Sequence, residues 1–222
     1  MKKSIEKITY CFVIIAALFV SFVSFVEPLV MKDINITKVI LVLLCYAAVF
    51  TGSLTLFRQL SERALYYLII AGIFAAVIVQ TYIVFHMRLV PEVDLNHIYD
   101  YCVDMVETGK ISYAESKYFA YNTNNIPLAI VIYYVFRMAS FAGMDYRIAG
   151  GLFNVLLILV MYVSAFFILK KVTTIQTTAV YMALLLTNPS FYAYASYYYT
   201  DTISAGLVMA GVGFIIYGCY KK

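Results

Sequence analysis

Charged residues are scarce in this chain. They make up 13% of its 222 residues, whereas about a quarter of the residues of a soluble domain are charged. Apolar residues reach 64%, so most of the chain needs a bilayer as its solvent. The net charge of +4 comes from short basic clusters between apolar runs, and this distribution argues against nucleic acid as a partner. The composition predicts an integral membrane protein surrounded by membrane lipids.

The chain also lacks internal repeats and the short motifs that identify disulfide frameworks and metal sites. Three of its four cysteines fall inside apolar runs, which leaves Cys102 without an evident disulfide partner. Neither a His-Glu-x-x-His sequence nor paired Cys-x-x-Cys sequences are present. A divalent metal is the one cofactor that stays open, with His97 and Asp201 as its candidate ligands.

Long apolar runs take the place of charge. A spanning helix requires about 20 apolar residues. Six runs approach that length: Ile8 to Val26, Val39 to Phe57, Ala64 to Phe85, Ile148 to Leu169, Thr178 to Ala195 and Ile203 to Tyr220. Asn188 and Pro189 interrupt the fifth run and predict a kink. The first run follows three lysines, as in a signal peptide, but no small-residue cleavage site follows it, so we interpret it as a retained helix.

The apolar stretch from Ile126 to Gly143 decides the topology. It is short and carries Arg137 near its middle, where a charge facing lipid would cost at least about 2.5 kcal/mol. If the stretch does not cross the bilayer, Lys170 and Lys171 join most of the other basic residues on the cytoplasmic side, as the positive-inside rule favours. We therefore interpret it as an interfacial or re-entrant helix, with the amino terminus in the cytoplasm, and we expect a bacterial plasma membrane.

This topology leaves one large outer loop, residues 88–147. Seven of the twelve carboxylates of the chain lie in it. Hydrophilic residues gather where there is water, and this accounts for most of these acids. Leu95, Ile98 and Cys102 recur at helical spacing, with polar residues between them, and Gly109 follows. The pattern predicts an amphipathic helix lying along the membrane surface. The predicted fold is thus all-α and polytopic, with about six transmembrane helices: two in residues 1–63, and four in residues 64–222 together with the loop and its juxtamembrane helices.

Two carboxylates are candidates for catalysis because both should lie at the outer membrane surface. Asp94 follows the third apolar run by a few residues, and Asp201 lies where the fifth run should emerge and the sixth begin. Each could instead cap a helix, since Asp is a favoured N-cap residue.

Three basic residues and a tyrosine are candidates for binding a phosphate. Arg137, Arg147 and Lys117 could hold one, because Arg in particular offers paired donors to phosphate oxygens. Anchoring to lipid headgroups would explain the same residues. Tyr199 belongs to a tyrosine-rich run beside Asp201 and could contact substrate, or it could belong to an interfacial aromatic girdle.

The order of these features from Ala64 to Lys222 resembles the GT-C type of polytopic glycosyltransferase, which includes the protein mannosyltransferases and the lipid A aminoarabinose transferase. Asp94 matches an acid that opens the first large outer loop. The stretch from Tyr118 to Pro127 resembles the Tyr-Phe and Asn/Pro-rich sequence before a juxtamembrane helix.

The later features follow in the same order. Arg147 matches an Arg that opens the next span, and Asp201, after Pro189, matches a second outer acid. Two features depart from the pattern: Leu95 stands where many relatives carry a second acid, and family members usually continue through several more spans. The resemblance therefore also suits an amino-terminal portion of such an enzyme.

The resemblance implies a reaction and its partners. A sugar would pass from a polyprenyl-phosphate carrier to an acceptor hydroxyl or amine at the outer membrane face. Asp94 would act as the general base, and Asp201 could partly hold a metal. The lipid-linked sugar donor would be the main partner, and a further membrane subunit could be another.

Two other classes of protein stay open. A transporter or channel usually places ionisable residues near the bilayer midplane, and the six apolar runs lack interior charges, which leaves a transporter of a neutral or lipid-linked substrate. A non-catalytic assembly subunit is favoured by the short length of the chain.

Overall fold

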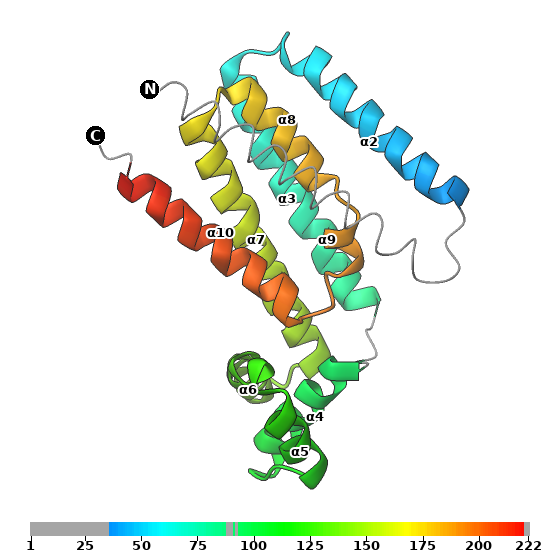
Figure 1. The fold of residues 1–222 in the computed structure, drawn as a ribbon, viewed down its shortest axis with the longest axis vertical. Helices are drawn as coiled ribbons and strands as arrows, with labels where there is room; N and C mark the ends of the chain where they lie inside the picture. The colour runs from blue at the N-terminus through cyan, green and yellow to red at the C-terminus, as the bar shows by residue number, and fades with distance from the viewer. Residues whose placement is uncertain (1–35, 88–90, 92, 220–222) are drawn as a thin grey trace. The chain divides into compact units, whose positions relative to one another are not determined.

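The structure, a computed structural model, describes residues 36–87, 91 and 93–219. Within these ranges every regular element is a helix, which confirms the predicted all-α class (Figure 1). The chain divides into two compact units, Met1–Gly52 and Ser53–Lys222. Helix α2, Ile36–Phe57, contains the second predicted run, and the first predicted run lies outside the described residues. The candidate site lies entirely in the second unit.

Three of the described helices are long and apolar enough to cross a bilayer. They are α3 (Glu62–His86), α7 (Tyr146–Val172) and α10 (Thr200–Cys219). Their 20 to 27 residues correspond to lengths of about 30 to 40 Å at 1.5 Å per residue. They coincide with three of the six predicted spans, and the total of six stays a prediction.

The ends of α3 and α7 follow from their capping residues. The Ser61 hydroxyl accepts the N–H of Ala64 at 3.3 Å and begins α3. The Asp145 carboxylate accepts the N–H groups of Arg147 at 2.8 Å and Ile148 at 3.4 Å and begins α7. Such caps satisfy amide groups that have no partner within the helix. Each helix therefore begins before its apolar run, at a polar residue.

The fifth predicted run is interrupted more sharply than a kink. Helix α8 covers only Ile175–Leu186, and the one-turn helix α9 follows at Ser190–Ala193. Pro189 cannot donate a backbone hydrogen bond, and the Asn188 side chain accepts the N–H of Ser190 at 3.0 Å. The local side-chain bond and the missing donor end the helix at Leu186, so the predicted continuation to Ala195 is wrong.

The broken segment keeps its carbonyl groups paired through two buried amides. Gln80 on α3 donates to the carbonyl of Phe191 at 3.2 Å. Asn154 on α7 donates to the carbonyls of Tyr194 at 2.9 Å and Ala195 at 3.0 Å. Both amide side chains are fully buried. Because an unpaired carbonyl is costly in an apolar interior, these bonds hold α9 and the residues directly after it against α3 and α7.

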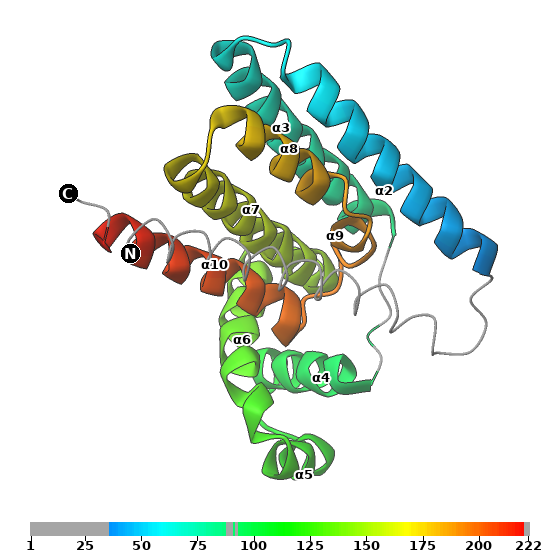
Figure 2. The same cartoon turned by 45° about the horizontal axis from the view of Figure 1, so that its top comes forward.

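The predicted outer loop folds into a helical layer. It contains α4 (Val93–Glu107), α5 (Tyr113–Tyr121), the short 3-10 helix η1 (Thr123–Asn125) and α6 (Ile126–Phe141). Figures 1 and 2 show α4, α5 and α6 gathered at one end of the bundle formed by α3, α7 and α10.

Helix α4 is amphipathic, as predicted, but its apolar face is covered by protein. Leu95, Ile98 and Cys102 are fully buried and share a core with Ile132 and Phe136 of α6. The last turn ends at Glu107, and Gly109 follows in the left-handed region at φ 67°, where glycine is favoured. The apolar stripe of α4 therefore packs on α6, and it is the outer face of α6 that stays uncovered.

Helix α6 does not run alongside the long helices. Figure 1 views α6 nearly end-on, whereas α7 and α10 extend across the picture. Its 16 residues correspond to about 24 Å, less than the roughly 30 Å of a hydrocarbon core. Tyr134, Met138 and Phe141 are exposed along it. These features fit the predicted interfacial helix.

Candidate functional site

The site is built around Asp94 and Tyr199, which are 105 residues apart in the chain. The Tyr199 hydroxyl donates a hydrogen bond to Oδ2 of Asp94 at 2.8 Å. Asp94 lies in the first turn of α4 and Tyr199 directly precedes α10. Asp94 therefore makes a long-range contact that joins the beginnings of two helices, beside any capping role that it has.

Tyr118 and Asn125 complete a network around this carboxylate. The Asn125 side chain donates to the Tyr118 hydroxyl at 2.6 Å. Hydrogen bonds also link Tyr118 to Asp94 and Asn125 to Tyr199. Asn125 is 1% exposed and lies where η1 leads into α6. The network thus ties the beginnings of α4, α6 and α10 to α5.

Both phenols in the network hold their protons firmly. Burial raises the pKa of Tyr118 to about 12; the hydrogen bond to Asp94 adds to this effect, and the bond from Asn125 opposes it. Burial also raises the pKa of Tyr199, as do the hydrogen bond and charge of Asp94 and the charge of Asp201, while Asn125 again opposes the rise. At neutral pH both hydroxyls are therefore donors toward Asp94.

The backbone beside Asp94 is in an unusual conformation. Val93 has a φ of 51°, in the left-handed region that β-branched residues rarely occupy. Such a conformation costs on the order of 1–3 kcal/mol and is found most often at functional sites. The network on Asp94 begins directly after this residue, so the surrounding contacts hold the strained turn in place.

Asp201 lies next to the network without entering it. It is in the first turn of α10 and is exposed. Its charge helps to raise the pKa of Tyr199, as the charge of Asp94 does. The two predicted catalytic acids therefore act on the same phenol from two different helices.

Arg147 is near the network through a neighbouring tyrosine. Its guanidinium lies 5.5 Å from the ring centroid of Tyr99, on α4. Tyr198, which precedes Tyr199, is buried with no hydrogen-bond partner for its hydroxyl. Burial raises the pKa of Tyr198, and the charge of Arg147 opposes the rise. Arg147 is thus the predicted phosphate-binding cation that approaches the residues beside Asp94.

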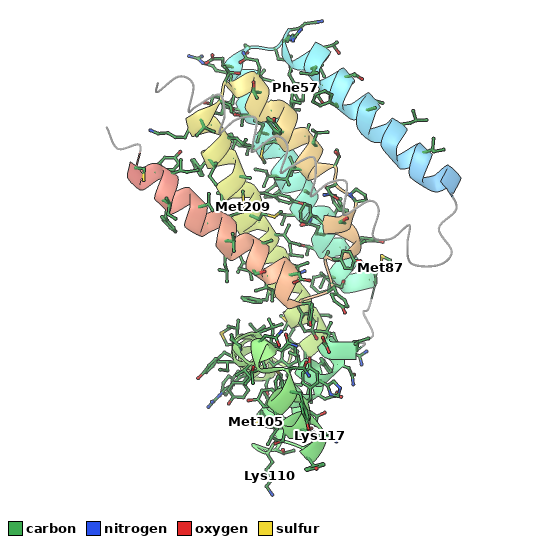
Figure 3. All side chains as sticks on the ribbon, in the orientation of Figure 1. Phe57, Met87, Met105, Lys110, Lys117 and Met209 are labelled. Carbon is green, nitrogen blue, oxygen red and sulfur yellow. The ribbon has the colours of Figure 1, made fainter. Side chains whose placement is uncertain are left out.

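The other two predicted cations face away from this network. Arg137 is exposed and donates to the Tyr133 hydroxyl at 3.1 Å on its own helix. Lys117 is exposed on α5, and Figure 3 shows it at the same end of the second unit as Met105 and Lys110. Neither forms an ion pair with an acid among the described residues. Arg137 is therefore free to contact headgroups, whereas the alternative of pairing with the loop's acids is absent from this part of the chain.

The candidate metal ligands His97 and Asp201 belong to different helices, α4 and α10. Nδ1 of His97 lies 3.6 Å from Oε1 of Glu115, and the His97 ring stacks on Tyr118. In the described ranges no three His, Cys, Asp or Glu side chains come together as a metal site would require. Whether the protein binds a divalent metal stays a prediction.

No protein-family model, curated protein or solved structure matches this chain. A functional assignment therefore rests on the geometry of the site and on the order of the sequence features.

Sequence reasoning missed the roles of Tyr118 and Asn125. Both belong to the stretch that resembles the family, but nothing in their spacing assigns a side chain to the site. They are seven positions apart in the chain, and α5 ends between them. The one available signal was the Asn-Asn-Ile-Pro sequence, which predicts an N-cap at Asn125; in the structure the Asn125 side chain makes no capping bond and donates to Tyr118 instead.

Asp100 provides a test of the electrostatics of α4. Burial raises the pKa of its carboxyl, and the charges of Glu115 and Asp104 raise it further, while Asn96 and His97 lower it. A raised pKa in the folded state means that the contribution to stability is full at low pH and is lost as the pH rises through that pKa. Asp100→Asn should therefore raise the thermal unfolding midpoint at pH 7.

The gain from Asp100→Asn should shrink as the pH falls toward 3.8, the ordinary pKa of Asp, because the raised pKa makes the folded wild-type protein take up this proton first. Thermal unfolding of both proteins at pH 7 and pH 4 checks this. Glu107→Gln removes the same charge from an exposed position of the same helix and serves as the control. An equal gain in both variants would mean that net charge, and not burial of Asp100, is the cause.

Proposed function

We propose that this chain is an integral membrane glycosyltransferase of the GT-C type, or the amino-terminal part of one, that transfers a sugar from a polyprenyl-phosphate donor. The observation that carries the proposal is the 2.8 Å hydrogen bond between Tyr199 and Asp94. It joins the acid that opens the loop to the segment of the second acid, the two places where the family resemblance expects function.

In the proposed reaction Asp94 is the general base. The acceptor hydroxyl or amine gives its proton to the Asp94 carboxylate and forms a bond to the anomeric carbon of the sugar. The bond between that carbon and the phosphate oxygen breaks, and polyprenyl phosphate leaves with the electron pair. A carboxylate held by two phenol donors is fixed in orientation, which is the condition that general base catalysis requires.

The leaving phosphate requires positive charge, and Arg147 is the proposed source. It is the one cation of the three predicted that lies beside the tyrosines of the site. Asp201 would contribute a second carboxylate, either toward the acceptor or toward a metal bound to the phosphate. The polyprenyl tail would lie against the apolar helices α7 and α10.

The topology of the proposal keeps six spans and places the layer of α4, α5 and α6 at the outer membrane face. The uncovered face of α6, with Tyr134, Met138 and Phe141, would rest in the interface, and Arg137 would reach the headgroups. The apolar length of α3, α7 and α10 supports membrane integration.

The direct test is turnover by the purified protein in lipid nanodiscs. Radiolabelled polyprenyl-phosphate sugar is added with a panel of hydroxyl and amine acceptors, and release of polyprenyl phosphate is measured together with labelled product. We expect protein-dependent release and transfer, and Arg147→Ala should lower kcat/KM by at least about tenfold, the scale for losing a bond to a charged group. Arg58→Ala, an exposed Arg at the end of α2, is the matched control.

Absence of turnover with every donor and acceptor would count against the enzyme. In that case an unchanged glycan profile in cells that carry the Asp94→Asn and Asp201→Asn variants would favour the non-catalytic assembly subunit. Protein-dependent movement of the labelled donor across the bilayer without chemical change would instead favour a transporter.

A further inference from the structure

Helices α4 and α5 contact each other through two matched pairs of residues. Asp94 and His97 are three residues apart on α4, and Glu115 and Tyr118 are three residues apart on α5. Residues at this spacing share one face of a helix. Asp94 hydrogen-bonds to Tyr118, and His97 approaches Glu115 at 3.6 Å. The order of the paired residues is reversed between α4 and α5, so the two helices are antiparallel at this contact.

The second pair joins a partly exposed histidine, His97, to a buried acid, Glu115. Glu115 is 6% exposed, and the cation that approaches it is His97 when the imidazole is protonated. Asp100 also faces Glu115, because the charge of Glu115 raises the pKa of Asp100. A buried carboxylate close to another acid is costly unless a donor or a positive charge stands beside it. His97 occupies that position.

The imidazole of His97 also forms the floor for Tyr118. Its ring lies parallel to the Tyr118 ring, with centroids 4.3 Å apart and an interplanar angle of 18°. Tyr118 is the residue whose hydroxyl links Asp94 and Asn125. A change in χ1 would swing this ring and move its hydroxyl away from both partners, and the stacked imidazole opposes that movement.

We propose that His97 is a positioning residue: stacked on Tyr118 and held beside the buried Glu115, it keeps the Tyr118 hydroxyl on Asp94. The kinetic part of this inference rests on the proposed glycosyl transfer, whereas its structural part does not. The role differs from metal binding, because the property that matters is a flat ring in a fixed place.

The test compares His97→Ala, which removes the ring, with His97→Phe, which keeps a flat ring and cannot bind a metal. Amide hydrogen exchange is followed by mass spectrometry in the full chain in nanodiscs. Exchange in α5 should become about tenfold faster in His97→Ala, the order expected for loss of an aromatic pair. His97→Phe should recover most of the protection, because it keeps the stacked ring although it loses the donor beside Glu115.

The chain offers a matched control, because its other histidine also stacks on a tyrosine ring. His86 stacks on Tyr82 with centroids 3.9 Å apart and an interplanar angle of 18°, on α3 and outside the network. His86→Ala should leave exchange in α5 unchanged. If His97→Ala also leaves it unchanged, or if His97→Phe exchanges as fast as His97→Ala, the positioning role is wrong.

A kinetic measurement separates this inference from the proposed function. If the wild-type protein transfers sugar, kcat should fall about tenfold in His97→Ala and recover in His97→Phe, while KM for the donor changes little. Loss of activity in both variants would favour a metal ligand and overturn the inference. If the wild-type protein transfers no sugar, the proposed function fails, and the exchange experiment still decides the positioning role.

Discussion

Asp94→Asn should reduce glycosyl transfer by about a hundredfold to ten-thousandfold, the range that a positioned general base contributes. The substitution keeps the size of the side chain and an oxygen that accepts the Tyr199 hydroxyl, which lies 2.8 Å from Oδ2 in the wild-type site. It removes the negative charge, one of the two acceptor oxygens and the ability to take a proton. Initial rates of product formation at saturating donor and acceptor measure the effect.

Two comparisons make the result for Asp94→Asn specific. Asp104→Asn removes a carboxylate from the same helix, and it should retain nearly full activity. The thermal unfolding midpoint of Asp94→Asn should stay within a few degrees of the wild-type value, because the remaining oxygen still accepts the Tyr199 hydroxyl. Full activity in Asp94→Asn would show that the carboxylate has a structural role, and the proposed base would then have to be sought elsewhere.

Gly206→Ala should cause the largest loss of stability among single-carbon changes in the second unit. Gly206 of α10 lies so close to α7 that an added Cβ would come within 2.4 Å of the carbonyl oxygen of Leu157. A backbone atom cannot rotate away as a side chain can, so the two helices must separate. Overpacking of this kind costs on the order of 1–3 kcal/mol.

The measurement is thermal unfolding, where the midpoint should fall by several degrees for a chain of this size. Gly211→Ala is the matched control on the same helix, since an added Cβ there meets no atom within 4 Å. It should leave the midpoint unchanged or raise it slightly, because Ala favours a helix more than Gly does. Equal losses in the two variants would mean that the contact at Leu157 is unimportant.

Helices with a strong apolar pattern could be predicted from the sequence. The runs from Ala64 to Phe85 and from Ile148 to Leu169 fall inside α3 and α7, and each helix extends a few residues beyond its run to a polar cap. Apolar runs identify what lipid or core will cover, whereas the ends of a helix depend on side-chain hydrogen bonds that have no periodic signal.

The break after α8 could be foreseen only in part. Pro189 marks its position, but the extent of the break depends on which groups receive the freed carbonyls. Gln80 and Asn154 supply those partners from 111 and 40 residues away. Contacts at such separations cannot be derived from local propensity.

The candidate site shows the same division. Asp94 and Asp201 could be named from their positions relative to the apolar runs, and the structure brings both to Tyr199. Asn125 could not be named, because a buried amide and an exposed one are identical in sequence. Of the three predicted cations, Arg147 lies beside Tyr99, whereas Arg137 and Lys117 are exposed, and the phosphate-binding role of all three stays a prediction.

The amides that hold the broken segment also bear on how the chain enters a bilayer during synthesis. Gln80 and Asn154 both precede the carbonyls of Phe191, Tyr194 and Ala195 along the chain. The side chains that donate to the later segment are therefore synthesised before it, on α3 and α7. In the proposed membrane setting, the later segment can therefore pack onto α3 and α7 as it inserts. Its carbonyl groups then accept hydrogen bonds from these helices and are not left unpaired in hydrocarbon.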